Sequence, residues 1–397
     1  MKVNTNSKKI EELLTRGVEN IYPTTEFFGK RLKSGEQLTM YTGYDPTAPT
    51  LHIGHGITLL KLRQFQELGH KVVMLIGDFT GMIGDPTDKT ATRRKLTREQ
   101  VLENCRYYQE QASSILDFVG DNPVEIRYNS QWLSRMAWED VLELAAHVTV
   151  QRLLERDMFE RRIKDAKPIY LHEFMYPLMQ GYDSVAMDVD GEVGGNDQTF
   201  NMLMGRTMMK DLKNKEKLVL TMRLLADPSG QKMGKSEGNM VALSDSPEDM
   251  FGKVMSWIDN MIITGFELCT RVPMKEIKKM GQEMEKGINP RDYKLRLAYE
   301  VTNIFLGKDA ADKAQERFIQ TFSKREIPTE MPELRPSKYD IVTVLIEAKI
   351  VPSKSEARRV VQQGGVKVVD NKIDSIDAVV KPGDVVQKGS RWFVRVK

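Results

Sequence analysis

The sequence predicts an α/β fold in which a doubly wound, mostly parallel sheet carries helices on both faces. Strand-like and helix-like stretches alternate through the first half of the chain, and this alternation favours a parallel sheet. At 397 residues the chain exceeds one typical domain, so we expect further domains after the sheet.

The predicted strands are apolar or alternating runs that end in turn-forming residues. They are LTMYTGYDP (38–46), KVVMLIGD (71–78), PVEIRYN (123–129) and KLVLTMRLL (217–225). Between the first two, residues 54–68 have the apolar spacing of a helix. Ligands of such a sheet gather at the carboxyl ends of the strands, so we expect the site there.

Helices follow the sheet. IKKMGQEMEKG and DAADKAQERFIQTF are amphipathic and rich in helix-forming residues. The next segment, KREIPTEMPELRPSK, contains three prolines within nine residues, which predicts an extended linker. We therefore expect a sheet domain with an insertion at 1–245, a helical domain at 246–323, a linker at 324–337 and a last domain at 338–397.

Composition excludes several classes of protein. No apolar run approaches the ~20 residues of a membrane span, and the N-terminus lacks a signal-peptide core, so we expect a cytoplasmic protein. Cys105 and Cys269 are isolated, which argues against a disulfide framework and a CxxC metal site. Residues 337–397 carry 12 Lys and Arg against 7 Asp and Glu, whereas the preceding residues carry 47 against 49. This basic tail fits nucleic-acid binding or a solvated basic surface.

The stretch TLHIGHGITLL places His52 and His55 three residues apart before an apolar helix. A helix start near Gly54 offers unpaired backbone N–H groups to an anion, and imidazoles donate to phosphate oxygens. The preceding turn, GYDPTAPT, adds Gly43 and Thr47. We interpret the stretch as a nucleotide site. Two surface histidines remain an alternative, whereas no Glu or His follows at the spacing of a zinc site.

A second stretch, DPSGQKMGKSEGNM, is rich in glycine and carries Lys232, Lys235 and Ser236. Two ammonium groups suit the charge that develops on a polyphosphate during displacement. A Walker A motif would need glycine at position 229, where Ser229 stands, so we reject that interpretation. A solvated surface loop is the remaining alternative.

HIGH, followed about 180 residues later by KMGKS, resembles the paired motifs of class I aminoacyl-tRNA synthetases. The middle residue of the second motif is usually Ser in that family and is Gly234 here, with both lysines kept. This resemblance implies a Rossmann-like catalytic domain. MYTGYDPT, GDPTDK, EFMYPLMQGYDSVAM and VGGNDQTFN are in turn similar to tyrosyl-tRNA synthetases, over nearly the whole chain.

The spacing of Tyr176, Gln180 and Asp183 puts all three on one face of a helix, either a binding face or a solvent-facing polar stripe. The resemblance implies that Tyr41 and Asp183 bind a phenol. It also implies that Tyr176, Gln180 and Asp85 hold the α-ammonium group of the amino-acid substrate, and that Gln198 completes the amino-acid site.

The resemblance also implies a nucleotide site. Thr47 and His52 would bind the outer phosphates, His55 would lie near the ribose, and Lys232 and Lys235 would close over pyrophosphate. The residues expected to bind ATP are Gly43, Asp45, Gly54, Thr58, Gly195, Asp197 (on the ribose), Lys235 and Ser236. ATP would be a substrate accompanied by Mg²⁺, without a tightly bound cofactor or a metal site formed by the protein.

Residues 337–373 predict two helices, the second at about 354–363 and ended by Gly364-Gly365, and strands follow to the C-terminus. This pattern resembles the small α-L RNA-binding domain of bacterial-type tyrosyl enzymes. Lys354, Arg358 and Arg359 on the second helix suit RNA phosphates. A small stabilising α+β module is the alternative.

The resemblance implies tyrosine, ATP and tRNA as partners, a homodimer, and no membrane. Two other functions stay open at this point. One is an RNA-binding protein that has lost catalysis. The other is a different adenylate-forming nucleotidyltransferase, which would need neither the basic tail nor a tyrosine-like pocket.

Overall fold

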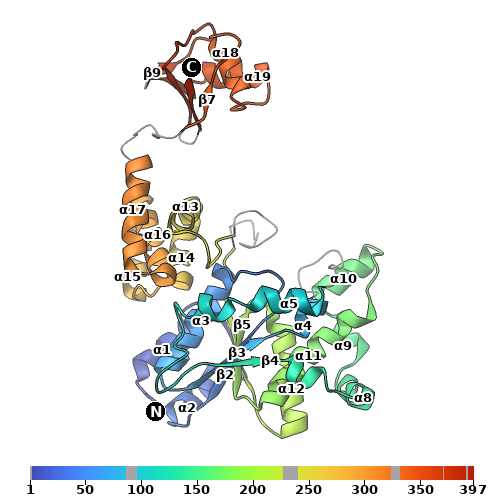
Figure 1. Ribbon diagram of the computed structural model, residues 1–397. Coiled ribbons are helices and arrows are strands. Elements are labelled where there is room, and N and C mark those ends of the chain that lie inside the picture. Colours follow the sequence, from blue (N-terminus) through green and yellow to red (C-terminus); the bar gives the residue numbers. More distant parts are fainter. Residues whose placement is uncertain (1, 86–95, 227–239, 323–330, 370, 390–391) are drawn as a thin grey trace. The chain divides into compact units, whose positions relative to one another are not determined.

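The computed structural model describes residues 2–85, 96–226, 240–322, 331–369, 371–389 and 392–397 (Figure 1). The chain forms two compact units, residues 1–314 and 315–397. The finer boundaries expected within the first unit, and the limits of the linker, stay predictions. None of the described helices has both the length and the apolar character that crossing a bilayer requires.

The first unit is built on a six-stranded sheet with the order β1-β6-β5-β2-β3-β4. The strands are β1 (Val18–Tyr22), β2 (Thr39–Tyr44), β3 (Lys71–Ile76), β4 (Glu125–Tyr128), β5 (Gly191–Gly195) and β6 (Leu218–Met222). All neighbours are parallel except β1, which pairs with β6 in the antiparallel sense at one edge. The chain order reverses between β2 and β5, so the predicted doubly wound sheet is confirmed and its switch point lies there.

Helices cover both faces of the sheet. The helix α3 (Ile53–Glu67) lies on one face, and α11 (Leu171–Met187) lies on the other. The side chains of β2 show this, because residues 41 and 44 point to opposite faces of the sheet. The Tyr44 hydroxyl bonds the Thr58 hydroxyl of α3 at 2.9 Å, whereas the Tyr41 hydroxyl bonds the Ser184 hydroxyl of α11 at 2.8 Å.

The other helices of this part of the chain surround the sheet or connect its strands. They are α1 (Ser7–Thr15), α2 (Thr25–Lys33), α4 (Thr80–Ile83), α5 (Arg98–Cys105), α6 (Tyr108–Ala112), α7 (Ser130–Leu133), α8 (Trp138–Ala146), α9 (Val150–Leu154), α10 (Asp157–Lys164) and α12 (Thr199–Lys213). A short 3₁₀ turn at Asn196–Gln198 follows β5. Its position places polar side chains at the carboxyl end of the central sheet.

The predicted helical segment is confirmed. Its helices are α13 (Pro247–Met255), α14 (Ile262–Cys269), α15 (Met274–Glu285), α16 (Arg291–Leu306) and α17 (Lys308–Phe322), with a 3₁₀ turn at Asp259–Met261. The helix α16 packs on α3 so closely that a Cβ at Gly56 would lie 2.6 Å from Phe305 Cζ. Glycine at that position therefore permits the contact.

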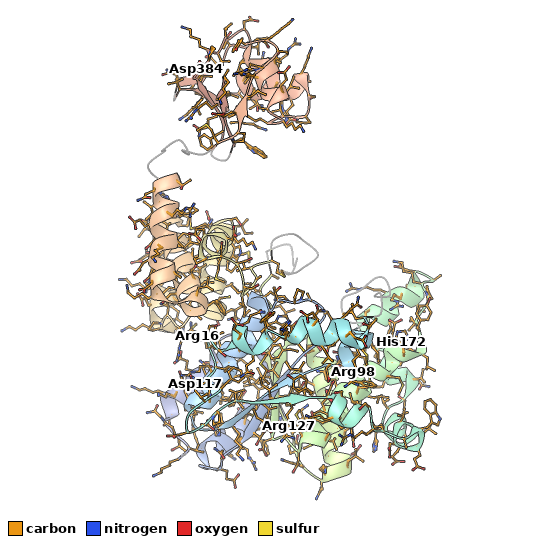
Figure 2. The ribbon with its side chains drawn as sticks, in the orientation of Figure 1. Arg16, Arg98, Asp117, Arg127, His172 and Asp384 are labelled. Carbon is orange, nitrogen blue, oxygen red and sulfur yellow. The ribbon has the colours of Figure 1, made fainter. Side chains whose placement is uncertain are left out.

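Arg16, labelled in Figure 2, follows α1 and is buried against α14. Its guanidinium donates to four backbone carbonyls, those of Phe266, Glu267, Thr270 and Val272, at 2.6–3.1 Å. Lys61 of α3 donates to the carbonyls of Leu13 (2.7 Å) and Arg16 (3.0 Å). The end of α1 thus ties α3 to the helical segment.

In the described residues from 331 onward, the second unit contains a five-stranded sheet and the helices α18 and α19. Its elements are β7 (Glu333–Leu334), α18 (Ile341–Glu347), α19 (Lys354–Gln362), β8 (Val366–Val368), β9 (Asn371–Ile373), β10 (Val385–Lys388) and β11 (Trp392–Val396), and the strand order is β7-β11-β10-β8-β9. Both predicted helices are confirmed. Gly364, at φ +66°, ends α19 as expected, because glycine adopts this left-handed conformation without strain.

Candidate functional site

The switch point of the sheet is where the predicted site residues meet. After β2 the chain turns through Asp45 and Thr47, whose N–H donates to the Asp45 carbonyl at 2.7 Å, and then enters α3. After β5 it turns through Asn196–Gln198 into α12. The carboxyl ends of two adjacent parallel strands therefore carry a polar turn each, as an α/β ligand site requires.

His52 and His55 form the first turn of α3, with stacked rings whose centres are 3.8 Å apart. His52 Nδ1 accepts the Gly54 N–H and His55 Nδ1 accepts the His52 N–H, each at 3.1 Å. Because both Nδ1 atoms accept, a neutral ring carries its proton on Nε2 and donates from that side. We expected unpaired backbone N–H groups here, and this was wrong for His52, Ile53 and Gly54. The imidazoles, rather than these backbone groups, can donate to an anion.

The chain that follows the predicted lysine loop lies beside this helix start. Ile53 N–H donates to the Val241 carbonyl, and Leu243 N–H donates to the Leu51 carbonyl, each at 2.9 Å. Lys232, Lys235 and Ser236 lie outside the described residues. The pairing nevertheless brings the segment directly after the second motif into contact with the first.

The predicted polar face of α11 points into the fold. Tyr176 and Asp183 are buried, so the alternative of a solvent-facing stripe was wrong. The Tyr176 hydroxyl donates to Asp45 Oδ2 at 2.8 Å, and Gln180 Nε2 donates to Glu192 Oε1 at 3.1 Å. Asp45 thus holds Tyr176, a contact that the expectation of an ATP role for Asp45 did not include.

Asp183 is a buried carboxyl group with two donors that sequence reasoning missed. Trp132 Nε1 donates to Oδ1 at 2.7 Å, and Asn129 Nδ2 donates to Oδ2 at 3.3 Å. Burial raises the pKa of Asp183 well above its usual value, the two donors lower it, and the carboxylates of Glu192 and Asp45 raise it. Asn129 directly follows β4, and this position at a strand end was a usable signal.

Tyr41 lies in the same buried cluster. Burial raises the pKa of its phenol well above the usual value, so its hydroxyl stays protonated at neutral pH. Lys217 Nζ lies 5.6 Å from the centre of the Tyr41 ring and forms a buried ion pair with Glu192. Neither Lys217 nor Glu192 was predicted. The usable signal was a charged residue in or beside an apolar strand of the sequence, because such a residue needs a buried partner.

The remaining predicted residues lie in the segments that follow the strands, in the strands themselves, or in α3. Asp85 accepts from Gln198 Nε2 at 2.7 Å, so these two lie together as expected. Gly43 is exposed in β2 and Gly195 ends β5. Thr58 is buried, and its hydroxyl donates to the His55 carbonyl within α3 at 2.9 Å, while its expected contact with ATP stays a prediction.

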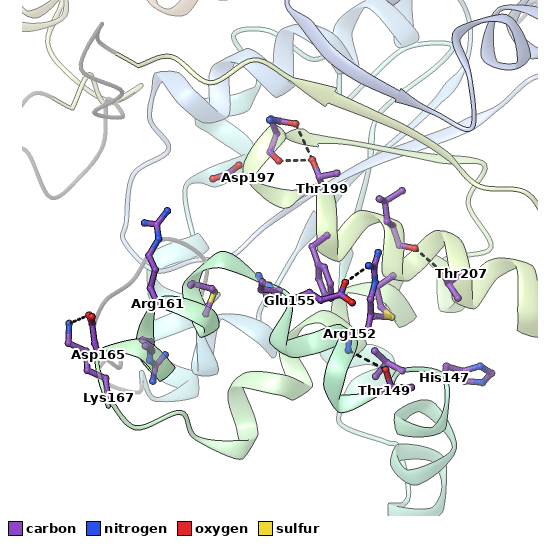
Figure 3. A pocket seen from close by; sticks show the side chains of 18 residues that line it. His147, Thr149, Arg152, Glu155, Arg161, Asp165, Lys167, Asp197, Thr199 and Thr207 are labelled. Carbon is purple, nitrogen blue, oxygen red and sulfur yellow. Dashed lines mark hydrogen bonds and ion pairs between the residues drawn. The ribbon is translucent and has the colours of Figure 1, made fainter.

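A cavity of about 900 Å³ adjoins the turn after β5 (Figure 3). It is bounded by residues 147–167 on one side and by the start of α12 on the other, and Asp197 lies on its wall. Its charged lining residues are Arg152, Arg156, Arg161, Arg162 and Lys167 against Glu155, Asp165 and Asp197. The positive excess makes the cavity suitable for an anionic ligand.

Comparisons with known proteins decide the family. Residues 33–323 match the family described as tRNA synthetases class I (W and Y), and residues 320–393 match the Tyrosine--tRNA ligase SYY-like C-terminal domain. The tyrosine–tRNA ligases of Thermotoga maritima and Haemophilus influenzae are each 46% identical to this chain, over 97% of it and 96% of their own length. The chain belongs to the class I tyrosine–tRNA ligase family.

A solved structure has the same fold. The C-terminally truncated mitochondrial tyrosyl-tRNA synthetase of Aspergillus nidulans superposes with a TM-score of 0.68 at 22% identity, covering 79% of this chain and 94% of that one. Membership of the tyrosine–tRNA ligase family excludes the alternative of a different adenylate-forming nucleotidyltransferase.

Proposed function

We propose that this chain activates L-tyrosine with ATP to tyrosyl-adenylate, releases pyrophosphate, and transfers tyrosine to the 3′ end of its tRNA. The observation that carries the proposal is the buried Asp183 carboxyl, held by Trp132 and Asn129 beside Tyr41, in a chain of this family. Asp183 offers an acceptor and the Tyr41 hydroxyl offers a donor, and the phenol hydroxyl of tyrosine can bond to both.

The amino acid would bind across the switch point. Its phenol O–H donates to Asp183 and accepts from the Tyr41 hydroxyl. Its α-ammonium group is held by three acceptors, Asp85, Tyr176 and Gln180, and Gln198 keeps Asp85 in place through their 2.7 Å hydrogen bond. Phenylalanine is disfavoured because it brings no hydroxyl to Asp183 and Tyr41, so the buried acceptor and donor that face the ligand would each lack the hydrogen bond that tyrosine makes.

ATP would lie beside the amino acid, over the start of α3. The tyrosine carboxylate oxygen attacks the α-phosphorus in line, and the bond from that phosphorus to the bridging oxygen of pyrophosphate breaks. No protein nucleophile takes part, so catalysis rests on positioning and on stabilisation of charge. Thr47 and His52 donate to the outer phosphates, and Lys232 and Lys235 neutralise the departing pyrophosphate.

The other nucleotide contacts complete this arrangement. His55 would lie near the ribose and Asp197 would accept from its hydroxyl groups. Gly43, Gly54, Gly195 and Ser236 would allow the nucleotide to approach the backbone. We expect Mg²⁺ to enter with ATP, because this ion binds through nucleotide phosphates while it keeps several waters.

The tRNA would use two basic surfaces. The cavity beside Asp197 has a positive excess among its lining residues, which suits the phosphates of the 3′ end. On the second unit, Lys354, Arg358 and Arg359 lie on α19, with both arginines exposed. We further propose a cytoplasmic location, which suits the two free cysteines.

We also propose a homodimer. Large apolar side chains are exposed close together in sequence around α8, α10 and α11: Trp138 (75%), Leu142 (56%), Ile163 (53%), Tyr170 (49%) and Leu171 (78%). Exposed apolar surface of this kind marks protein interfaces. Sedimentation equilibrium should give twice the chain mass of 45.5 kDa, and Leu171→Asp should shift the equilibrium toward monomer.

ATP–pyrophosphate exchange with each of the twenty amino acids tests the proposal. Exchange with tyrosine alone supports both the activation chemistry and the pocket. Exchange with another amino acid would overturn the roles of Tyr41 and Asp183. No exchange from folded protein that still binds tRNA would favour a chain that has kept RNA binding and lost catalysis.

A further inference from the structure

We propose that the buried Glu192–Lys217 ion pair positions the tyrosine pocket: Glu192 orients Gln180, and Lys217 sets a positive charge beside Tyr41 and Asp183. The pair touches pocket residues rather than substrate, so its members are positioning residues. The inference rests on the roles proposed above for Tyr41, Gln180 and Asp183.

The sheet places the pair directly behind the pocket. Tyr41 and Glu192 are register partners across β2 and β5, the two strands of the switch point, so their side chains leave the same face of the sheet. Glu192 Oε1 accepts from Gln180 Nε2 at 3.1 Å, and its Oε2 accepts from Lys217 Nζ. The Glu192 carboxylate thus connects the Lys217 ammonium to Gln180, the side chain proposed to hold the α-ammonium group of tyrosine.

The pair is a poor device for stability alone. Its side chains are 3% and 0% exposed, so both charges are fully removed from water. Desolvation of such a pair offsets most of its Coulomb attraction, and apolar replacements of similar volume are often neutral or stabilising. A costly pair at this place therefore indicates a role in the pocket, where charge and orientation matter.

Electrostatics link Lys217 to the phenol-binding end. Burial lowers the pKa of Lys217, while the carboxylates of Glu192 and Asp183 raise it, so the ammonium interacts electrostatically with both. Glu192 and Asp183 repel each other when both are charged. Without Lys217, the negative charge of Glu192 would act on Asp183 without a compensating cation, which weakens Asp183 as the charged acceptor of the phenol.

The helix α12 leaves room for the Lys217 ammonium, because a glycine lies at the point of closest approach. A Cβ at Gly205 of α12 would lie 2.6 Å from Lys217 Nζ and 2.9 Å from Ser184 Oγ, the partner of the Tyr41 hydroxyl. Lys217 also donates to the Met202 carbonyl of α12 at 3.2 Å. The ammonium is therefore held in one position beneath α11 and α12.

The test compares Lys217→Met, Glu192→Gln and the double variant with the matched control Lys215→Met. Lys215 lies two residues away and pairs with Asp188 and Asp190, outside the buried cluster. Exchange kinetics with tyrosine and with phenylalanine give KM for the amino acid, KM for ATP and the tyrosine/phenylalanine ratio of kcat/KM. Thermal unfolding reports stability separately.

Lys217→Met should raise KM for tyrosine at least tenfold, leave KM for ATP within about twofold, and lower the tyrosine/phenylalanine ratio at least tenfold. The double variant should recover part of the tyrosine affinity and part of the tyrosine/phenylalanine ratio that Lys217→Met loses. The reason is that the neutral amide introduced by Glu192→Gln no longer needs a cation and still faces Gln180. Lys215→Met should behave as the wild type. If Lys217→Met does not fold, Glu192→Gln and the double variant carry the same comparison.

A purely structural role would lower the unfolding temperature and change both substrates together, with the tyrosine/phenylalanine ratio preserved. That result, or an unchanged KM for tyrosine in folded variants, would overturn the inference. Failure of the proposed function looks different, because the wild type itself would then show no exchange with tyrosine.

Discussion

The two imidazoles at the start of α3 are fixed by the helix that they cap. His52 Nδ1 binds the Gly54 N–H and His55 Nδ1 binds the His52 N–H, so neither ring rotates without losing a backbone hydrogen bond. This fixes the tautomer of each neutral ring and the direction of its Nε2 donor. Two histidines three residues apart, a weak signal alone, thereby become a rigid pair of donors.

Replacing His52 with asparagine should separate capping from catalysis. Asparagine is a good N-cap, so the start of α3 is retained, but its side chain is too short to replace Nε2. We expect kcat for adenylate formation to fall about 10- to 100-fold, the loss of one or two hydrogen bonds to a charged group, with an unchanged unfolding temperature. Pre-steady-state adenylate formation measures it. An unchanged rate would remove His52 from the phosphate site.

Asp183→Asn should weaken tyrosine selectively. The amide keeps the shape of the side chain but offers the phenol O–H a weaker, neutral acceptor, a change worth about 1.5–3 kcal/mol. We expect kcat/KM for tyrosine to fall about 10- to 100-fold and the value for phenylalanine to change little. Asp188→Asn, the same substitution at the exposed end of α11, is the control. A preserved tyrosine/phenylalanine ratio would contradict the assignment of Asp183.

At the scale of elements, the sequence predicted those strands and helices whose pattern is local. The strands β2, β3, β4 and β6 and the helix α3 follow apolar runs or helical spacing. β1 was missed because Glu19 and Asn20 make it polar, as an edge strand permits, and β5 was missed because it contains three glycines. Lys217 and Glu192 could not be paired from sequence, since 25 positions separate them and only the strand order brings them together.

The contact between α11 and α12 depends on Gly205. An added methyl group there would meet Lys217 Nζ and Ser184 Oγ at 2.6 and 2.9 Å, so Gly205→Ala should destabilise the fold by about 1–3 kcal/mol. Gly252→Ala in α13 is matched, because that site has no atom within 4 Å and should gain about 0.5–1 kcal/mol of helix propensity. Urea unfolding of both variants checks the difference. A stabilised Gly205→Ala protein would mean that the two helices separate without cost.

Lys61, at the junction of α1 and α3, should make the free energy of unfolding depend on pH. Burial, followed by the charge of Arg16, lowers the pKa of Lys61 to about 7 from an ordinary value of 10.5. Between these values the unfolded chain binds more protons, so stability should rise with pH across that window, by about 5 kcal/mol at most. Its two acceptor carbonyls suit the two N–H groups of the neutral amine.

Lys61→Met should lack this rise. The difference in unfolding free energy between wild type and Lys61→Met should grow from pH 7 to pH 10, whereas Lys71→Met, which removes an exposed lysine, should give a constant difference. Urea unfolding at each pH measures both. Parallel pH profiles for wild type and Lys61→Met would show that the Lys61 ammonium is not destabilised by burial.

Across the whole molecule, the two units divide the proposed work. The described residues of the proposed tyrosine and ATP sites belong to residues 1–314, and α19, with its basic residues, belongs to residues 315–397. Activation of tyrosine and binding of tRNA should therefore respond to different substitutions. A charge change on α19 should leave adenylate formation untouched, since none of the described residues proposed to bind tyrosine or ATP belongs to that unit.

Replacing Lys354, Arg358 and Arg359 together with glutamine tests this division in the full chain. Each lost phosphate contact should lower the magnitude of the slope of log K against log salt by roughly 0.7–0.9, so three contacts should lower it by roughly 2–3. KM for tRNA in aminoacylation should rise at least tenfold at low salt, while ATP–pyrophosphate exchange with tyrosine stays at the wild-type rate. Aminoacylation measured from low to high salt, with exchange as the internal control, checks both statements. An unchanged salt slope would assign α19 to the stabilising α+β module, with tRNA held by the first unit alone.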